Sequence, residues 1–244
     1  MEKIVSGWHS PRLNQHVEVV RWGHYGHPLL LFPTAGGDAQ ECERFLMIRA
    51  LKPLIDAGRL KVYSCDSVSG RAWIDDRHSG AYRARVQSLF DGFITQELVP
   101  AIRTDCRTPG IEIACAGASV GAFNALSTIC RHPDIFDLAI CMSGTYNVTG
   151  WMKGDHTLDF HHASPIHFLP TLPEGPQLHQ LRQRFILLAL GQGRWESPHH
   201  SWQAAEVLGS RGIPNYVDQW GTEWDHDWPT WRAMLPMYLD KMLL

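Results

Sequence analysis

Apolar residues follow two patterns, and stretches of one pattern alternate with stretches of the other along the chain. Short runs, either continuous or alternating with polar residues, are typical of β-strands, and a continuous run such as 28–32 favours a strand covered on both faces. Longer stretches with apolar residues three and four positions apart predict amphipathic helices. The expected strands span 2–9, 16–22, 28–32, 60–65, 111–116, 136–142, 184–190 and 213–220. The expected helices span 42–57, 82–102, 201–211 and 229–244, and another follows the 111–116 strand and ends near 131.

The order of these elements predicts an α/β fold. The first two strands follow each other across a short turn, so they should be antiparallel. From residue 28 onward strands alternate with helices, which favours a mostly parallel central sheet with helices on both faces, within a single domain over 1–244. Residues 66–82 are polar and predict a loop. Residues 145–182 show no clear period, and we interpret them as an excursion that forms a lid or a pocket wall.

The same topology locates the expected functional site. In open α/β sheets, ligands bind beyond the carboxyl ends of the strands, so the loops that leave those ends should converge. The loops expected to meet there are 33–38, 66–82, 117–121, 143–180, 191–198 and 221–228.

Composition narrows the range of functions. A net charge of -3 over 244 residues gives no reason to expect nucleic acid or an anionic membrane as a partner. No secretion signal is visible, and no apolar stretch is long enough to span a bilayer. The six cysteines lack a Cys-x-x-Cys pair, and several lie in apolar runs, which favours buried, reduced thiols in a cytoplasmic protein. The sequence leaves the oligomeric state open, a homodimer included.

The segment 117–121, Gly-Ala-Ser-Val-Gly, carries the most specific chemical signal. It matches the G-x-S-x-G nucleophile elbow and stands between an expected strand and an expected helix. Strand and helix approach closely at such a turn, so only small side chains fit beside the serine, and Gly117 and Gly121 meet this requirement. The alternative is a glycine-rich turn with an exposed serine. The strand–turn–helix context favours Ser119 as a nucleophile.

A serine hydroxyl needs a base within hydrogen-bond reach, and the base needs an orienting carboxylate. In the chain order serine, acid, histidine, the base should follow the last strand, which selects His226 among fourteen histidines. Glu196 follows the preceding strand and is the expected acid, with Asp155 as the alternative. Asp225 and Asp227 adjoin His226 in sequence, so they are more suited to solvating or capping their loop. The competing interpretation of His226 is a capping histidine, and that of Glu196 is an exposed loop glutamate.

The oxyanion formed during ester cleavage needs preorganised N–H donors. Val120, the residue after the nucleophile, should supply one. The loop after the 28–32 strand should supply the other, with Ala35 as first choice and Gly36 next. For any single residue of this loop, a plain turn is an equally good interpretation.

The other motifs give weaker signals for function. His161-His162 and His199-His200 are adjacent pairs that chelate a metal poorly, so no metal site is expected. The lone Gly-x-Gly at 191–193 lacks a third glycine that opens a helix and does not support nucleotide binding. Ser143 is a second candidate nucleophile, but it lacks the flanking small residues of an elbow.

The chain resembles the α/β-hydrolase branch of putative esterases that includes esterase D and the mycobacterial mycolyltransferases. The motifs that carry the resemblance are Phe32-Pro-Thr-Ala-Gly-Gly37, Gly117-Ala-Ser-Val-Gly-Ala122, Gly191-Gln-Gly-Arg-Trp-Glu196 and Trp220-Gly…His226-Asp-Trp-Pro-Thr-Trp231. The resemblance implies an α/β-hydrolase fold and a triad of Ser119, Glu196 and His226, with oxyanion amides near Ala35 and Val120.

The same resemblance implies hydrolysis of carboxylic or thiol esters of a small molecule, or acyl transfer to an alcohol, without a cofactor. The missing secretion signal argues against an acyltransferase of the cell envelope. A catalytically silent binding protein on this fold is the remaining alternative. The sequence does not select the acyl-chain length or the leaving group.

Overall fold

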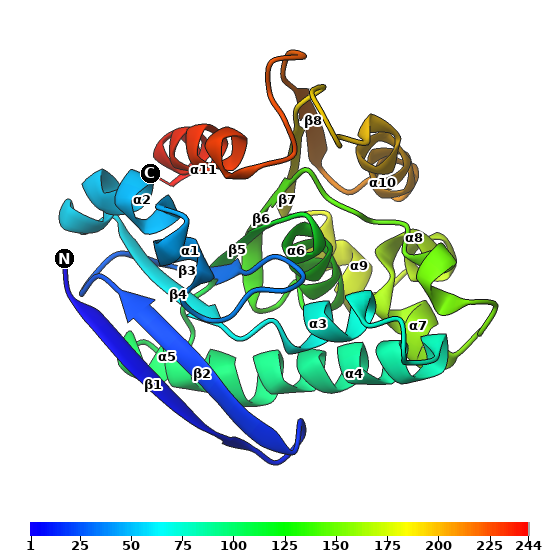
Figure 1. The fold of residues 1–244 in the computed structure, drawn as a ribbon, viewed down its shortest axis with the longest axis horizontal. Coiled ribbons are helices and arrows are strands. Elements are labelled where there is room, and N and C mark those ends of the chain that lie inside the picture. Colours follow the sequence, from blue (N-terminus) through cyan, green and yellow to red (C-terminus); the bar gives the residue numbers. More distant parts are fainter. Residues whose placement is uncertain (244) are drawn as a thin grey trace.

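The computed structural model describes residues 1–243 and is built on an eight-stranded sheet of order β1-β2-β4-β3-β5-β6-β7-β8 (Figure 1). The strands are β1 (Lys3–Ser10), β2 (Gln15–Trp22), β3 (His27–Phe32), β4 (Leu60–Cys65), β5 (Ile113–Ala118), β6 (Phe136–Met142), β7 (Phe185–Leu190) and β8 (Asn215–Gln219). β1 and β2 form an antiparallel hairpin, and β2 is also antiparallel to β4. The pairs from β4 through β3 to β8 are all parallel. The expected mixed, mostly parallel sheet is confirmed.

The helices lie on both faces of this sheet. They are α1 (Glu41–Arg44), α2 (Met47–Asp56), α3 (Val68–Ile74), α4 (Gly80–Phe93), α5 (Val99–Asp105), α6 (Val120–Arg131), α7 (Leu158–Ala163), α8 (Pro165–Phe168), α9 (Pro176–Leu181), α10 (Pro198–Ser210) and α11 (Trp228–Met242). Figure 1 shows α1, α2 and α11 on one side of the sheet and α4, α5 and α6 on the other. None of the helices in residues 1–243 combines the length and the apolar character needed to cross a membrane.

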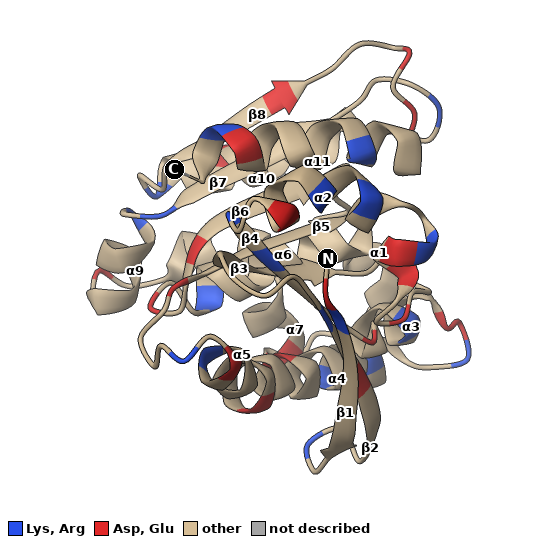
Figure 2. Cartoon of the chain, turned by 90° about the vertical axis from the view of Figure 1, so that its left-hand side faces the viewer, with Lys and Arg blue, Asp and Glu red and all other residues tan. Residues whose placement is uncertain are grey.

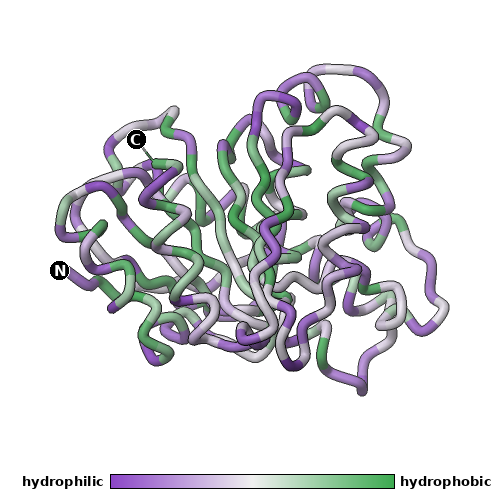
Figure 3. The backbone as a smooth tube through the Cα atoms, turned by 90° about the horizontal axis from the view of Figure 1, so that it is seen from above, coloured by the Kyte–Doolittle hydropathy of each residue, from purple (hydrophilic) through white to green (hydrophobic). Residues whose placement is uncertain are grey.

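Successive side chains of the inner strands point to opposite faces of the sheet, which explains why helices cover both faces. On β3, Leu30 packs into the cluster formed with α4, α5 and α6, while Leu31 packs into the cluster formed with α2 and α11. On β5, Cys115 and Ala116 divide in the same way. Burying one leucine side chain contributes roughly 1.5–3 kcal/mol, so a strand that is apolar at every position stabilises both layers. Figure 3 shows this arrangement as hydrophobic inner strands surrounded by hydrophilic loops.

Charged residues of both signs are interspersed over the outer elements in Figure 2, in keeping with the small net charge. The six cysteines are all free, and five of them are buried; Cys106 is partly exposed. The expectation of buried thiols at Cys65, Cys115 and Cys141 is confirmed.

The expected helix 42–57 is interrupted, which corrects the sequence-based prediction. α1 ends at Arg44, and Leu46 adopts a left-handed backbone with φ of 64° before α2 begins. The ring of Phe45 stacks on Trp228 at a centroid distance of 4.9 Å, and the Phe45 carbonyl accepts a hydrogen bond from Arg232. Tertiary contacts with the start of α11 therefore override the helical periodicity at this point.

The expected loop 66–82 contains a helix, which is the second correction. α3 spans Val68–Ile74 and buries Trp73 completely, with its indole N–H donating to Gln87 on α4. Ser69 is also fully buried, and its hydroxyl donates to Asn124 on α6 at 3.3 Å. Polar residues that are satisfied inside the protein conceal such a helix from a hydrophobic pattern.

The expected helix 82–102 is observed as a longer helical segment with a π-turn at Ile94–Leu98 between α4 and α5. The N–H of Val99 bonds to the carbonyl of Ile94, five residues earlier. Pro100 follows directly and lacks the N–H that a regular α-helix would use there. The wider π-turn lets the helical segment continue through this proline.

Residues 145–182 form short helical turns and the helices α7, α8 and α9, which pack against α4, α6 and α10. α7 contacts α4, and the Ser127 hydroxyl on α6 donates to the Ala163 carbonyl at 2.7 Å. This segment is thus anchored to two long helices of the body.

Candidate active site

Several of the loops at the carboxyl ends of the parallel strands contact one another in pairs. The loop after β3 contacts both the elbow and the segment that opens α3: a Cβ on Gly121 would lie 2.6 Å from the Pro33 oxygen, and one on Gly70 would lie 2.8 Å from the Ala35 oxygen. The loop after β6 contacts the loop after β7 through Ser143 and Glu196.

Ser119 occupies a strained turn between β5 and α6. Its backbone has φ of 57° and ψ of -120°, a conformation that is rare for a residue with a side chain. A Cβ on Gly117 would lie 2.3 Å from the carbonyl carbon of Gly121, so a larger residue cannot fit at either side of the turn without displacing backbone. Ser119 itself remains partly exposed. The turn therefore has the geometry that an exposed nucleophile requires.

The N-terminus of α6 points its backbone donors at the region beside Ser119. Val120 is the first residue of the helix, where the macrodipole favours negative charge. Ala35 packs against the same hydrophobic cluster that contains Val120 and Phe123. Within residues 1–243, neither the Ala35 N–H nor the Val120 N–H donates to a protein acceptor. The Val120 amide thus adjoins the serine in sequence, and the Ala35 amide lies in a loop that contacts the elbow.

Glu41 fixes the loop that carries Ala35. Its side chain accepts one hydrogen bond from the Thr34 N–H and one from the Thr34 hydroxyl, each at 2.7 Å. Glu41 is only 6% exposed, and hydrogen bonds to a buried carboxylate are stronger than those between neutral groups. This contact was not anticipated from the sequence.

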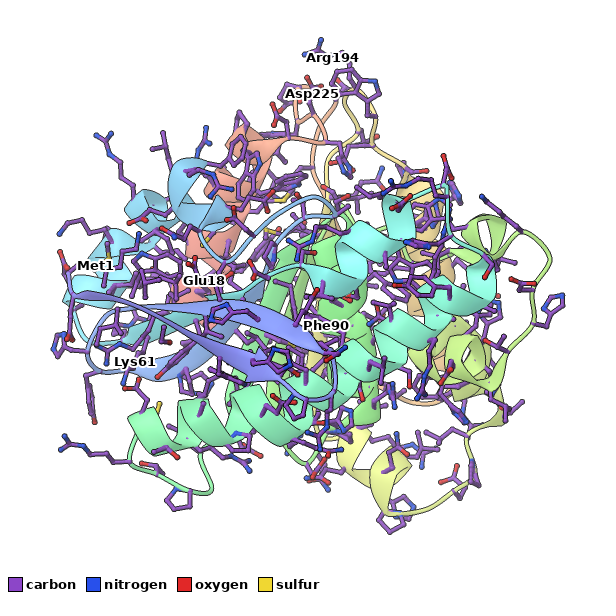
Figure 4. All side chains as sticks on the ribbon, turned by 60° about the horizontal axis from the view of Figure 1, so that its bottom comes forward. Met1, Glu18, Lys61, Phe90, Arg194 and Asp225 are labelled. Atoms are coloured by element: carbon purple, nitrogen blue, oxygen red, sulfur yellow. The ribbon has the colours of Figure 1, made fainter. Side chains whose placement is uncertain are left out.

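The loops after β7 and β8 are joined along their backbones. The Gly193 N–H donates to the Trp224 carbonyl at 2.9 Å, and the His226 N–H donates to the Arg194 carbonyl at 3.0 Å. The side chains of Arg194 and Asp225 extend the pairing at the tip of the two loops, where Figure 4 shows them next to each other. This pairing brings the expected acid and the expected base together.

Glu196 and His226 face each other across these loops. Glu196 Oε2 lies 3.7 Å from His226 Nδ1, which is longer than a hydrogen bond. The Glu196 side chain is 2% exposed and the His226 side chain 23% exposed. The other carboxylate oxygen accepts hydrogen bonds from the Ser143 hydroxyl at 2.5 Å and the Gly191 N–H at 3.2 Å.

The alternative acids have other partners. Asp155 accepts a hydrogen bond from the Ala81 N–H at 2.8 Å, at the start of α4. Asp227 caps α11 through the Trp228 N–H, and Asp225 binds Arg194. The structure thus offers Glu196 as the carboxylate that faces the His226 ring.

The remaining sequence candidates are engaged elsewhere. Ser143 is 4% exposed, and its hydroxyl is hydrogen-bonded to Glu196, so it is not positioned as a nucleophile. His200 Nδ1 accepts a hydrogen bond from the Asn147 N–H, and His199 Nδ1 lies 3.0 Å from the Ser197 hydroxyl. Among the described residues, no group of three or more histidines, cysteines or carboxylates has the arrangement of a metal site.

Two site contacts of Ser143 join distant parts of the chain. Its hydroxyl meets Glu196, 53 positions later, and Trp231, 88 positions later. No local motif signals contacts over such separations. Only the position of Ser143 at the end of a parallel strand indicated that it belongs near the site.

Comparison with known proteins relates this chain to esterases. The model of the family described as "Putative esterase" matches residues 53–242, well over half of the chain. A comparison with curated proteins gives no match. Three similar solved structures illustrate the likeness.

A ferulic acid esterase has a TM-score of 0.76 at 14% identity, over 99% of this chain and 98% of that chain. An S-formylglutathione hydrolase from Agrobacterium tumefaciens has a TM-score of 0.71 at 13% identity, over 99% of this chain and 92% of that chain. The fluorophosphonate-binding serine hydrolase F from Staphylococcus aureus has a TM-score of 0.63 at 16% identity, over 100% of this chain and 98% of that chain.

At these identities the structural likeness establishes the α/β-hydrolase fold, while the extent of the family match establishes the family. The elbow serine and the histidine–carboxylate pair at adjoining loops agree with both. The chain belongs to the putative esterase family and has the α/β-hydrolase fold.

Proposed function

We propose that the protein cleaves carboxylic or thiol esters of small molecules through an acyl-enzyme on Ser119, with His226 as the base and Glu196 as the acid that orients it. Two observations carry the proposal: a strained, partly exposed serine at a helix N-terminus, and a histidine in the loop after the last strand whose Nδ1 faces a buried carboxylate. A neutral imidazole oriented in this way has Nε2 available to accept the serine proton.

In the proposed reaction, Ser119 Oγ bonds to the ester carbonyl carbon while its proton passes to His226 Nε2. The carbonyl oxygen becomes an oxyanion held by the N–H groups of Val120 and Ala35, each worth about 10²–10³-fold in rate. His226 then gives the proton to the leaving alcohol or thiol as the ester bond breaks. Water repeats the sequence on the acyl-enzyme and releases the acid.

The proposal is tested with p-nitrophenyl esters of graded acyl-chain length. Wild-type protein should release p-nitrophenol with a burst equal to the enzyme concentration, and the chain-length preference then defines the acyl pocket. Ser119→Ala should fall to the background rate. Ser210→Ala, at the exposed end of α10, is the matched control and should keep wild-type turnover. A burst that survives in Ser119→Ala defeats the proposal.

Acyl transfer to an alcohol would use the same three residues. The partial exposure of Ser119 and His226 leaves the acyl-enzyme open to water, which supports hydrolysis as the main outcome. Measuring free acid against transfer product, with and without an added alcohol, separates the two. A silent binding protein would turn over none of the esters.

We further propose that the protein works in a reducing compartment, the cytoplasm. All six cysteines are free, and burial raises the pKa of Cys42, Cys65 and Cys141, which keeps these thiols protonated and unreactive. Cell fractionation with a thiol count on the isolated protein tests this placement. Recovery of the protein in an oxidising compartment would contradict it.

A further inference from the structure

Ser143 is held in a specified and unusual position at the carboxyl end of β6. Its backbone has φ of 48°, in the left-handed region that a residue with a side chain rarely adopts. The Ser143 N–H donates to the Ala189 carbonyl at 2.7 Å, and the residue is 4% exposed. Such a conformation persists only where the surroundings over-determine it, and it often serves a site.

The Ser143 hydroxyl has one donor and one acceptor as neighbours. The indole Nε1–H of Trp231 can only donate, and it lies 2.9 Å from Ser143 Oγ. The single hydroxyl proton is therefore directed to Glu196 Oε1, 2.5 Å away. Gly191 N–H shares the same carboxylate oxygen at 3.2 Å. One oxygen of Glu196 is thus occupied, and the other is left to face His226.

Trp231 also contacts the base. Its ring packs edge to face against the His226 imidazole, with centroids 5.2 Å apart and an interplanar angle of 82°. Trp231 is 4% exposed and lies in the first turn of α11, directly after the loop that carries His226. A single side chain therefore touches the base and fixes the hydroxyl that holds the acid.

We propose that Ser143 and Trp231 are positioning residues that extend the triad, in the order Trp231, Ser143, Glu196, His226. The proposal rests on the proposed function. We call this series of contacts the relay. It stops the Glu196 carboxylate from rotating, so Oε2 stays turned toward His226 Nδ1 and the ring presents Nε2 to Ser119. Both residues are 4% exposed, so we expect their effect to be on kcat more than on KM.

Single and double variants test the relay. Losing a hydrogen bond to a charged group lowers rate by about 10- to 100-fold, so Ser143→Ala should lower kcat by this amount and leave KM within about twofold. Trp231→Phe keeps a ring against His226 and removes only the N–H donor, so it should lower kcat by less, roughly 2- to 10-fold. Because both act through one hydroxyl, the double variant should match Ser143→Ala instead of multiplying the two effects.

Two readouts separate positioning from stability. In Ser143→Ala the acidic limb of the kcat/KM profile should move to lower pH, because a loosely held carboxylate stabilises the imidazolium less. Ser127→Ala is the matched control: it loses a buried serine hydrogen bond of 2.7 Å on α6, outside the triad contacts. It should lower the Tm as Ser143→Ala does, but keep the wild-type kcat and pH profile.

The outcomes also distinguish this proposal from the proposed function. Turnover that persists in Ser119→Ala removes the proposed function and the relay with it. If Ser119→Ala is inactive while Ser143→Ala keeps the wild-type kcat and pH profile, only the relay is overturned. Effects of Ser143→Ala and Trp231→Phe that multiply in the double variant overturn it as well.

Discussion

Arg194 and Asp225 join the loop that carries Glu196 to the loop that carries His226. Asp225 Oδ1 accepts a hydrogen bond from the Arg194 N–H at 2.7 Å, while Oδ2 accepts from Nε at 2.9 Å and from Nη2 at 2.7 Å. Hydrogen bonds from Arg194 lower the pKa of Asp225. The contact is therefore fully present above the ordinary carboxyl range and is lost only in strong acid, so it persists at neutral pH.

Breaking this contact should loosen the pairing of acid and base. We expect Asp225→Ala to lower kcat by about 2- to 5-fold, since an ion pair open to water contributes little. High salt should reduce the difference from wild type. Asp75→Ala removes a comparable exposed carboxylate–arginine pair, with Arg77, and should leave kcat unchanged. Equal kcat values for the two variants would show that the contact does not support the site.

The elbow should not tolerate side chains beside the serine. A Cβ at Gly117 or Gly121 would meet backbone atoms at 2.3 Å and 2.6 Å, and backbone cannot rotate away as a side chain can. We expect Gly117→Ala and Gly121→Ala to destabilise the fold by about 3 kcal/mol or more in chemical unfolding. Gly209→Ala on α10 meets nothing within 4 Å and should be neutral or stabilising. Unfolding midpoints that match across the three variants would refute the steric argument.

Glu41 holds the loop that carries Ala35 by accepting two hydrogen bonds from Thr34, and we call this contact the clamp. The clamp gives a further prediction. Glu41→Gln can still accept from the Thr34 hydroxyl, but its amide nitrogen cannot accept from the Thr34 N–H. We expect kcat to fall by about tenfold with a smaller change in KM, because the Ala35 N–H then loses its fixed position.

Glu43→Gln is the control for the clamp. Glu43 contacts Lys3 and Trp22 on the N-terminal strands, and its replacement should leave kcat as in wild type. A Glu41→Gln enzyme with unchanged kcat would show that the loop holds its shape without the clamp.

Stability should fall in mild acid partly because of His200. Burial, and then the nearby His199, lower the pKa of His200 below 6.5, and its Nδ1 accepts a hydrogen bond from the Asn147 N–H. The unfolded chain therefore takes up a proton that the folded protein does not. The stabilisation is present above pH 6.5 and is lost as the pH falls through and below that value.

Unfolding free energies measured between mildly acidic and neutral pH test this origin. His200→Asn should flatten the slope of stability against pH, while His24→Asn, at an exposed turn, should keep the wild-type slope. An unchanged slope in His200→Asn would assign the acid sensitivity to other groups, such as His167, whose pKa is also lowered by burial.

The sequence was most informative where one face or both faces of an element are apolar. β3 and β5 were recognisable because every position meets one of two cores. The elbow was recognisable because sterics restrict residues 117 and 121 to glycine. The rule that ligands bind beyond the carboxyl ends of parallel strands then placed Glu196 and His226 at adjoining loops.

The features that the sequence did not reveal depend on long-range contacts. The break at Leu46 follows from Phe45 packing on Trp228, and α3 is stabilised by polar bonds to α4 and α6. The Ser143 hydroxyl could have served as a nucleophile or as a support, and only its two partners decide between these roles. Periodicity reports which face is buried, not which distant residue meets it.

The central claim is that Ser119 is the nucleophile, and intact-protein mass spectrometry after treatment with a fluorophosphonate tests it most directly. We expect one adduct per wild-type chain, located on Ser119 by peptide mapping, and none on a folded Ser119→Ala protein. An adduct that forms on Ser119→Ala at the wild-type rate would contradict the account.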